Sequence, residues 1–166
     1  MKQIYILPAL CLMSGLAVGQ VTYPSDTILS SEESQVLKIE RQKRSIDSAI
    51  PSYNKIEKSR DSLGYRIVYY DGKELRLIEV FYKENGIDKK ASWYFNKGLL
   101  FYCESEWIRA DGNRISDDEK YYLADEHLIK WIIGENDVDT NSYGFLKAAK
   151  SIADYALKLK LENTYP

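Results

Sequence analysis

Glu79 and Glu104 are the side chains whose type and spacing best suit acid–base chemistry in this 166-residue chain. Both lie in segments where apolar and polar residues alternate, as they do in strands. Counting outward from turn signals at residues 85–86 and 96–98 places both on one face of a sheet, two strands apart, with Ser92 between them. Paired carboxylates beside aromatic rings are what a glycoside hydrolase uses.

A solvated surface explains the same pattern more simply. Lys90 is expected opposite Glu104, and a cross-strand ion pair needs no catalytic explanation. Rows of charged residues are usually solvated faces. The sequence therefore favours a non-enzymatic protein, and a carboxylate-based glycoside hydrolase is the weaker hypothesis.

The other reactive residue types indicate no further chemistry. His127 is the only histidine and lies in a predicted hairpin turn, where an exposed polar residue is the ordinary occupant, which argues against a Ser-His-Asp system and a histidine-based zinc site. Cys103 is expected on the core face, where cysteine acts as a small apolar residue. Oxygen-bearing side chains alternate at 137–141 as in a calcium loop, but the glycine and final glutamate of an EF-hand are missing, so we favour a helix cap there. We predict no metal and no cofactor.

An antiparallel sheet over residues 64–133 is predicted to position these side chains. Aromatic and β-branched residues between short turns indicate a β-meander of about six strands. The predicted core face collects Ile78, Val80, Ala91, Trp93, Phe95, Leu99, Phe101, Cys103 and Trp107. The opposite face, expected to be partly exposed, collects Leu77, Glu79, Phe81, Lys90, Ser92, Tyr94, Leu100, Tyr102 and Glu104. A bulge between the two turns would move the side chains of one strand to the opposite face, and Trp93 and Trp107 would then be the exposed rings.

Two amphipathic helices flank the predicted sheet. The first begins at a capping box of Ser30 and Glu33, is kinked at Pro51 and continues to about Arg60. Its apolar side carries Val36, Ile39, Ile46, Ile50 and Tyr53. The second covers 140–161 with a stripe of Phe145, Ala149, Ile152, Ala156 and Leu159. Because both helices need an apolar partner, we expect both on the core face, which makes the fold an α+β two-layer sandwich.

Residues 1–20 have the pattern of an export signal. They contain one lysine, an apolar run and small residues at positions 17 and 19. The apolar run is too short for a stable membrane span. We therefore expect a soluble periplasmic or extracellular protein in which residues 21–166 fold as a single domain, with a leader and helical segment at 21–63. A net charge of −2 argues against nucleic acid as a partner.

The working hypothesis is a small secreted or periplasmic binding module that uses the partly exposed sheet face. The stacking platforms are Phe81, Tyr94 and Tyr102, and the orienting polar groups are Glu79, Ser92 and Glu104. A carbohydrate or cell-wall fragment fits such a face, and so does another protein. The alternative is a structural or inhibitory interaction domain in which this face closes a homodimer or is covered by the second helix.

Overall fold

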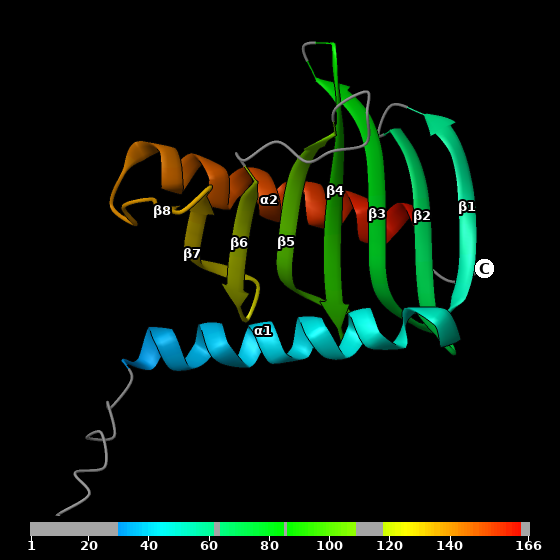
Figure 1. Cartoon of the computed structure of the whole chain (residues 1–166), viewed down its shortest axis with the longest axis horizontal. Helices are drawn as coiled ribbons and strands as arrows, with labels where there is room; N and C mark the ends of the chain where they lie inside the picture. The colour runs from blue at the N-terminus through cyan, green and yellow to red at the C-terminus, as the bar shows by residue number, and fades with distance from the viewer. Residues whose placement is uncertain (1–29, 62–63, 85, 109–117, 164–166) are drawn as a thin grey trace, which may run out of the picture.

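The chain forms an α+β fold of one sheet and two long helices (Figure 1), in a computed structural model that describes residues 30–61, 64–84, 86–108 and 118–163. The predicted export signal lies outside these residues. The helices are α1 (Ser31–Ala49), the short 3-10 helix η1 (Ile50–Ser52) and α2 (Tyr143–Glu162). The strands are β1 (Asn54–Asp61), β2 (Gly64–Asp71), β3 (Glu74–Glu84), β4 (Ile87–Asn96), β5 (Leu99–Ile108), β6 (Glu119–Ala124), β7 (His127–Ile133) and β8 (Asn136–Asp137).

The strands follow one another in the sheet in chain order, and every neighbouring pair is antiparallel. The predicted meander is thus confirmed, but it has eight strands instead of about six. Strand β1 occupies residues that were expected to continue the first helix beyond Pro51. Its side chains are mostly charged, as is common at a sheet edge, so the sequence around Ile56 carries little apolar periodicity that could indicate a strand.

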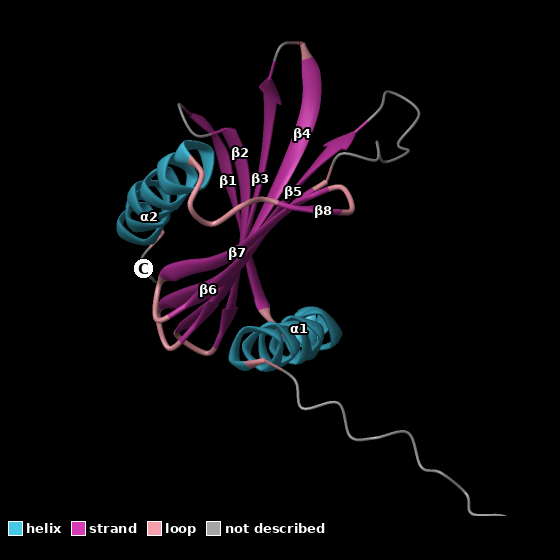
Figure 2. Cartoon of the chain, turned by 90° about the vertical axis from the view of Figure 1, so that its left-hand side faces the viewer, coloured by secondary structure: helices cyan, strands magenta, loops and turns pink. Residues whose placement is uncertain are grey.

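The helices lie on opposite faces of the sheet, which corrects the two-layer prediction to three layers (Figure 2). Helix α1 covers a cluster of Tyr69, Leu77, Tyr94, Phe101, Tyr102 and Tyr122. Helix α2 covers a cluster of Val68, Tyr70, Ile78, Val80, Ala91, Trp93, Phe95, Leu100, Cys103 and Leu123. Both faces therefore offer enough aromatic and aliphatic area to bury a helix, and the face expected to be partly exposed is a second core.

Both helices begin where the sequence predicts. Ser30 and Glu33 form the capping box at the start of α1, with hydrogen bonds of 2.8 and 3.1 Å. Ser142 caps α2 by accepting a hydrogen bond of 3.1 Å from the backbone N–H of Phe145. The predicted apolar sides of both helices are the sides that face the sheet. In the part of the chain that the structure describes, neither helix is apolar enough over enough length to cross a membrane.

The register between β3 and β4 matches the prediction, with Glu79 opposite Ser92. The β4–β5 hairpin differs because its turn has two residues, Lys97 and Gly98, both at positive φ, where three residues were expected. A bulge follows in the pairing, so that Tyr94 lies opposite Tyr102.

The bulge exchanges the faces of two side chains. Leu100 was expected on the partly exposed face, but it packs in the cluster below α2. Phe101 was expected on the core face beside Trp93, but it packs in the cluster below α1. An extra residue in one strand shifts the alternation of side chains by one position, which is the physical reason for the exchange.

Candidate functional site

The aromatic residues predicted as ligand platforms are packed inside the chain. Tyr94 is 4% exposed and Tyr102 is 1% exposed beneath α1, and Ser92 is also buried. Glu79, Phe81 and Glu104 are half-buried. Helix α1 therefore covers the central part of the sheet face that carries these residues.

A network of five side chains joins this face to α1. Lys43 forms ion pairs with Asp47 at 3.0 Å and with Glu104 at 3.2 Å. The hydroxyl group of Tyr94 donates to Asp47 at 2.9 Å, and that of Tyr102 donates to Glu104 at 2.9 Å. Because each carboxylate accepts from both a cation and a tyrosine, the half-buried charges are compensated within the network.

The electrostatics of the network keep its donors protonated. The Lys43 ammonium lies 5.1 and 5.6 Å from the ring centres of Tyr94 and Tyr102. Burial alone lowers the pKa of Lys43, but the carboxylates of Glu104 and Asp47 outweigh it and leave this pKa above its ordinary value. Burial, followed by the charge of Glu104, raises the pKa of both tyrosines. All three side chains therefore act as hydrogen-bond donors at neutral pH.

Glu79 belongs to a second set of contacts on the same face. It accepts a hydrogen bond of 2.7 Å from Tyr69 and forms an ion pair of 2.6 Å with Lys90. Lys90 lies opposite Glu106 in the sheet, not opposite Glu104 as predicted, because the two-residue turn and the bulge each shift the register by one position. Glu79 and Glu104 do flank Ser92 as expected. Their ion pairs favour a role in anchoring side chains over acid–base chemistry.

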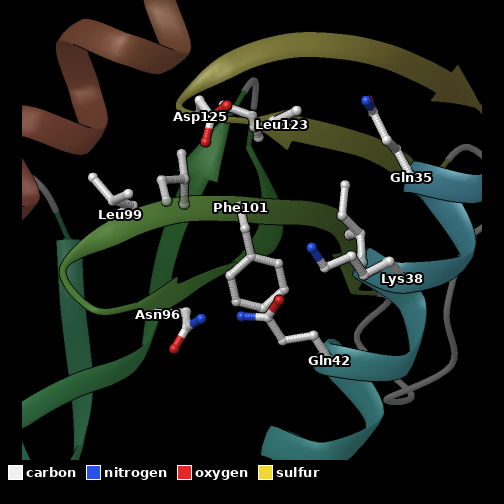
Figure 3. Close-up of a pocket in the computed structure, with 11 residues that line it drawn as sticks. Gln35, Lys38, Gln42, Asn96, Leu99, Phe101, Leu123 and Asp125 are labelled. Carbon is white, nitrogen blue, oxygen red and sulfur yellow. The ribbon is translucent and has the colours of Figure 1, made fainter. Parts of the chain in front are cut away.

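A groove lies between α1 and the tips of two hairpins (Figure 3). Its volume is about 270 Å³. Helix α1 contributes Gln35, Lys38, Ile39 and Gln42, and the two hairpins contribute Asn96, Leu99, Leu100, Phe101, Leu123, Ala124 and Asp125. We call this the α1 groove.

The α1 groove combines an apolar floor with a polar rim. In Figure 3, Lys38 and Gln42 reach from α1 toward the ring of Phe101, and Asn96 lies on the other side. Amide side chains can donate and accept hydrogen bonds at once. Asp125 adds a carboxylate from the β6–β7 turn, where its φ is 50°. This arrangement can hold a small polar ligand that also has an apolar face.

None of the groove residues was predicted as a site residue. The prediction placed both helices on the other face of the sheet, so the junction between α1 and the hairpin tips was not foreseen. One signal was present in the sequence: Gln35, Lys38 and Gln42 recur at intervals of three and four, which forms a polar line along one side of α1.

Phe81 is separate from the other predicted site residues and lines a second cavity of about 420 Å³. Its ring centre lies 5.8 Å from that of Tyr65. Burial, then the charge of Glu84, raises the pKa of the neighbouring Tyr82 to about 12. Phe81 thus remains the predicted platform that borders open space.

The residues considered for metal and nucleophile chemistry have structural contacts. Among residues 30–61, 64–84, 86–108 and 118–163, no group of histidine, cysteine and carboxylate side chains could hold a metal ion. His127 is exposed, with Nδ1 2.8 Å from the carbonyl oxygen of Asp125. Cys103 is buried, and burial raises the pKa of its thiol. Asp139 accepts from the backbone of Asn141 just before α2, as a capping segment does.

Comparison of the chain with models of known protein families, with curated proteins and with solved structures finds no match. Functional inference for this protein therefore depends on its own geometry.

Proposed function

We propose that this protein is an exported, non-enzymatic binding module that holds a sugar unit of a carbohydrate or cell-wall polymer in the α1 groove. One observation carries the proposal: polar side chains from α1 and from two hairpins converge around an apolar floor. None of the six site residues predicted from the sequence lines the α1 groove, and Phe81 lines a separate cavity.

A sugar ring matches the two kinds of surface in the groove. Its hydroxyl groups both donate and accept hydrogen bonds, as do the amides of Gln35 and Gln42; Asn96, whose Oδ1 accepts from Arg76 at 3.1 Å, can add its NH₂ group as a donor. Its C–H face can pack on Leu99, the most exposed apolar side chain that lines the groove, at 45%. Ligand pockets usually have roughly 300–1,000 Å³, so a groove of about 270 Å³ suits one ring of a longer chain.

The network beneath α1 supports this function by fixing one wall of the groove. Tyr94 and Tyr122 donate to Asp47 and Glu40 of α1, at 2.9 and 2.7 Å. Gln42 lies between these two anchor points on the helix. A wall that is already ordered loses little conformational entropy when a ligand binds.

Export is part of the proposal because residues 1–20 have the pattern of a signal. Cell-wall polymers and other extracellular glycans are found where an exported protein would meet them.

A thermal-unfolding screen of residues 21–166 tests the proposal. The panel contains neutral oligosaccharides, peptidoglycan fragments, peptides, calcium and a chelator. A ligand at about a hundred times its Kd adds about 2.7 kcal/mol to the free energy of unfolding. We expect stabilisation by a carbohydrate class, and none by peptides or calcium.

Variants of α1 locate the site. Gln42→Ala and Lys38→Ala should lose the stabilisation, whereas Arg41→Ala, exposed on the same helix but outside the groove, should keep it. A carbohydrate shift that survives both groove variants would remove the α1 groove as the site. A shift produced by peptides alone would contradict the ligand class.

A further inference from the structure

Helix α2 carries a second apolar stripe that its packing on the sheet does not use. The first stripe, which includes Phe145, Ile152 and Leu159, is buried. The second consists of Tyr143, Leu146, Leu157 and Leu161, which are 81%, 61%, 56% and 68% exposed. Large apolar side chains gathered on one surface commonly mark an interaction site.

The second stripe runs the whole length of α2. Steps of three and four residues, through Lys150 and Ala153, keep its members on one side of the helix. A helix of 20 residues is about 30 Å long. In Figure 2, α2 lies at the outer side of the sheet, away from α1, and no other described element covers its outward side.

The order of residues along the stripe is symmetric about its middle. If a second α2 runs antiparallel across the first, Tyr143 meets Leu161 of the second copy, and Leu146 meets Leu157 of the second copy. Ala153 lies near the centre, where a small side chain lets two helices approach closely. We propose that this stripe forms a two-fold symmetric interface with a second copy of this chain.

Charge complementarity supports the same pairing. In this arrangement Lys150 of one copy comes close to Asp154 of the other, and the two-fold axis repeats the contact. Both side chains belong to exposed positions of α2.

A groove of about 230 Å³ borders the stripe and enlarges the contact. Its lining includes Leu157 of the stripe and Ala153 near the middle of α2, together with Leu100, Leu123, Glu126, Ala156 and Lys160. A side chain of the second copy can enter this space, as a knob enters a hole. Stable interfaces bury roughly 1,200–2,000 Å², and contact with the groove adds area beyond the two helices.

An anionic membrane is the competing occupant, because Lys147, Lys150 and Lys158 are also exposed on α2. The second copy is favoured by the symmetric order of the stripe and by Asp154, which an anionic surface would repel. Because α1 lies on the opposite sheet face, a dimer formed through α2 leaves α1 uncovered and carries two α1 grooves.

Sedimentation equilibrium over about a hundredfold range of concentration tests the proposal. The wild-type protein should show a monomer–dimer equilibrium, and Leu146→Glu and Leu157→Glu should each raise the dissociation constant at least about tenfold. Leu37→Glu, a change at a 41% exposed leucine of α1, is the matched control and should leave the equilibrium unchanged. Circular dichroism establishes that each variant is folded.

A charge exchange tests the orientation. Lys150→Asp and Asp154→Lys should each weaken self-association, and a mixture of the two variants should restore it by forming mixed dimers. A protein that stays monomeric at all concentrations, or a dimer that resists both leucine variants, would overturn the proposal. Binding to vesicles that contain phosphatidylglycerol, lost in the same variants while the protein remains monomeric, would overturn it in favour of a membrane.

Discussion

The hydroxyl group of Tyr94 donates a hydrogen bond of 2.9 Å to Oδ1 of Asp47, which joins the C-terminal part of β4 to helix α1. A ring expected to meet a ligand is instead part of the attachment of α1 to the sheet. Because α1 forms one wall of the α1 groove, the strength of this attachment bears on both the stability of the fold and the order of the proposed binding site.

Removal of the Tyr94 hydroxyl should weaken this attachment. Tyr94→Phe keeps the ring and loses a hydrogen bond to a charged acceptor, so we expect the free energy of unfolding to fall by about 1–2 kcal/mol. Urea denaturation measures the change. Tyr65→Phe loses a similar bond to Glu57 on the exposed surface and should have a much smaller effect. Equal effects in the two variants would contradict the role of Tyr94.

Lys43→Met should leave two carboxylates close together without their shared cation. Lys43 pairs with Asp47 and Glu104 at 3.0 and 3.2 Å. We expect a loss of about 2 kcal/mol, measured by urea denaturation. Lys38→Met, at an exposed position of the same helix, should change little. Addition of Glu104→Gln to Lys43→Met should recover part of the loss, and a further loss of stability would show that repulsion is not the cause.

The fold should lose stability at alkaline pH. The pKa values of Lys43, Tyr94 and Tyr102 are raised in the folded chain. A group with a raised folded pKa contributes stability that is complete below its unfolded pKa and is lost as the pH rises through its folded pKa. The free energy of unfolding should therefore begin to fall near about pH 10, where unfolded lysine and tyrosine titrate.

Urea denaturation at a series of pH values, with tyrosinate absorbance recorded alongside, checks this pH dependence. The double variant Tyr94→Phe/Tyr102→Phe should lose stability less steeply above about pH 10. An increase in stability over the same range would contradict the sign.

Gly64→Ala should be strongly destabilising. Gly64 has a φ of +101°, and an added Cβ would lie 2.6 Å from the carbonyl oxygen of Phe81, which belongs to the backbone of β3. We expect a loss of about 2 kcal/mol or more in thermal or urea unfolding. Gly144→Ala in α2 is the control: the nearest atom to its Cβ would be 3.8 Å away, so helix propensity should make this variant neutral or slightly stabilising.

The periodic elements could be predicted because their signals are local. The capping box at Ser30, the stripe around Ile152 and the hairpin that places Glu79 opposite Ser92 all depend on neighbouring residues. Strand β1 could not be predicted in this way. Its charged residues become a strand only through pairing with β2.

The candidate site could not be predicted from the sequence, for a different reason. Tyr94 and Trp93 are adjacent in β4 and face opposite sides, and either face is aromatic enough to receive a helix. The sheet face on which α1 packs is determined by tertiary contacts, and residue spacing cannot predict it. The bulge that moves Phe101 to the α1 side likewise depends on how β4 and β5 pair. The α1 groove forms only because α1 packs on this face and because the bulge places Phe101 beneath it.

The most direct test of the proposed function is a titration of isotopically labelled residues 21–166 with a neutral oligosaccharide, followed by NMR. The side-chain amide signals of Gln35, Gln42 and Asn96 report on the α1 groove, and that of Asn136 on β8 serves as a distant reference. The proposal predicts saturable shifts of the three groove amides and no shift of Asn136. Shifts that cluster instead around Tyr65 and Phe81, or no saturable shift with any carbohydrate of the panel, would contradict it.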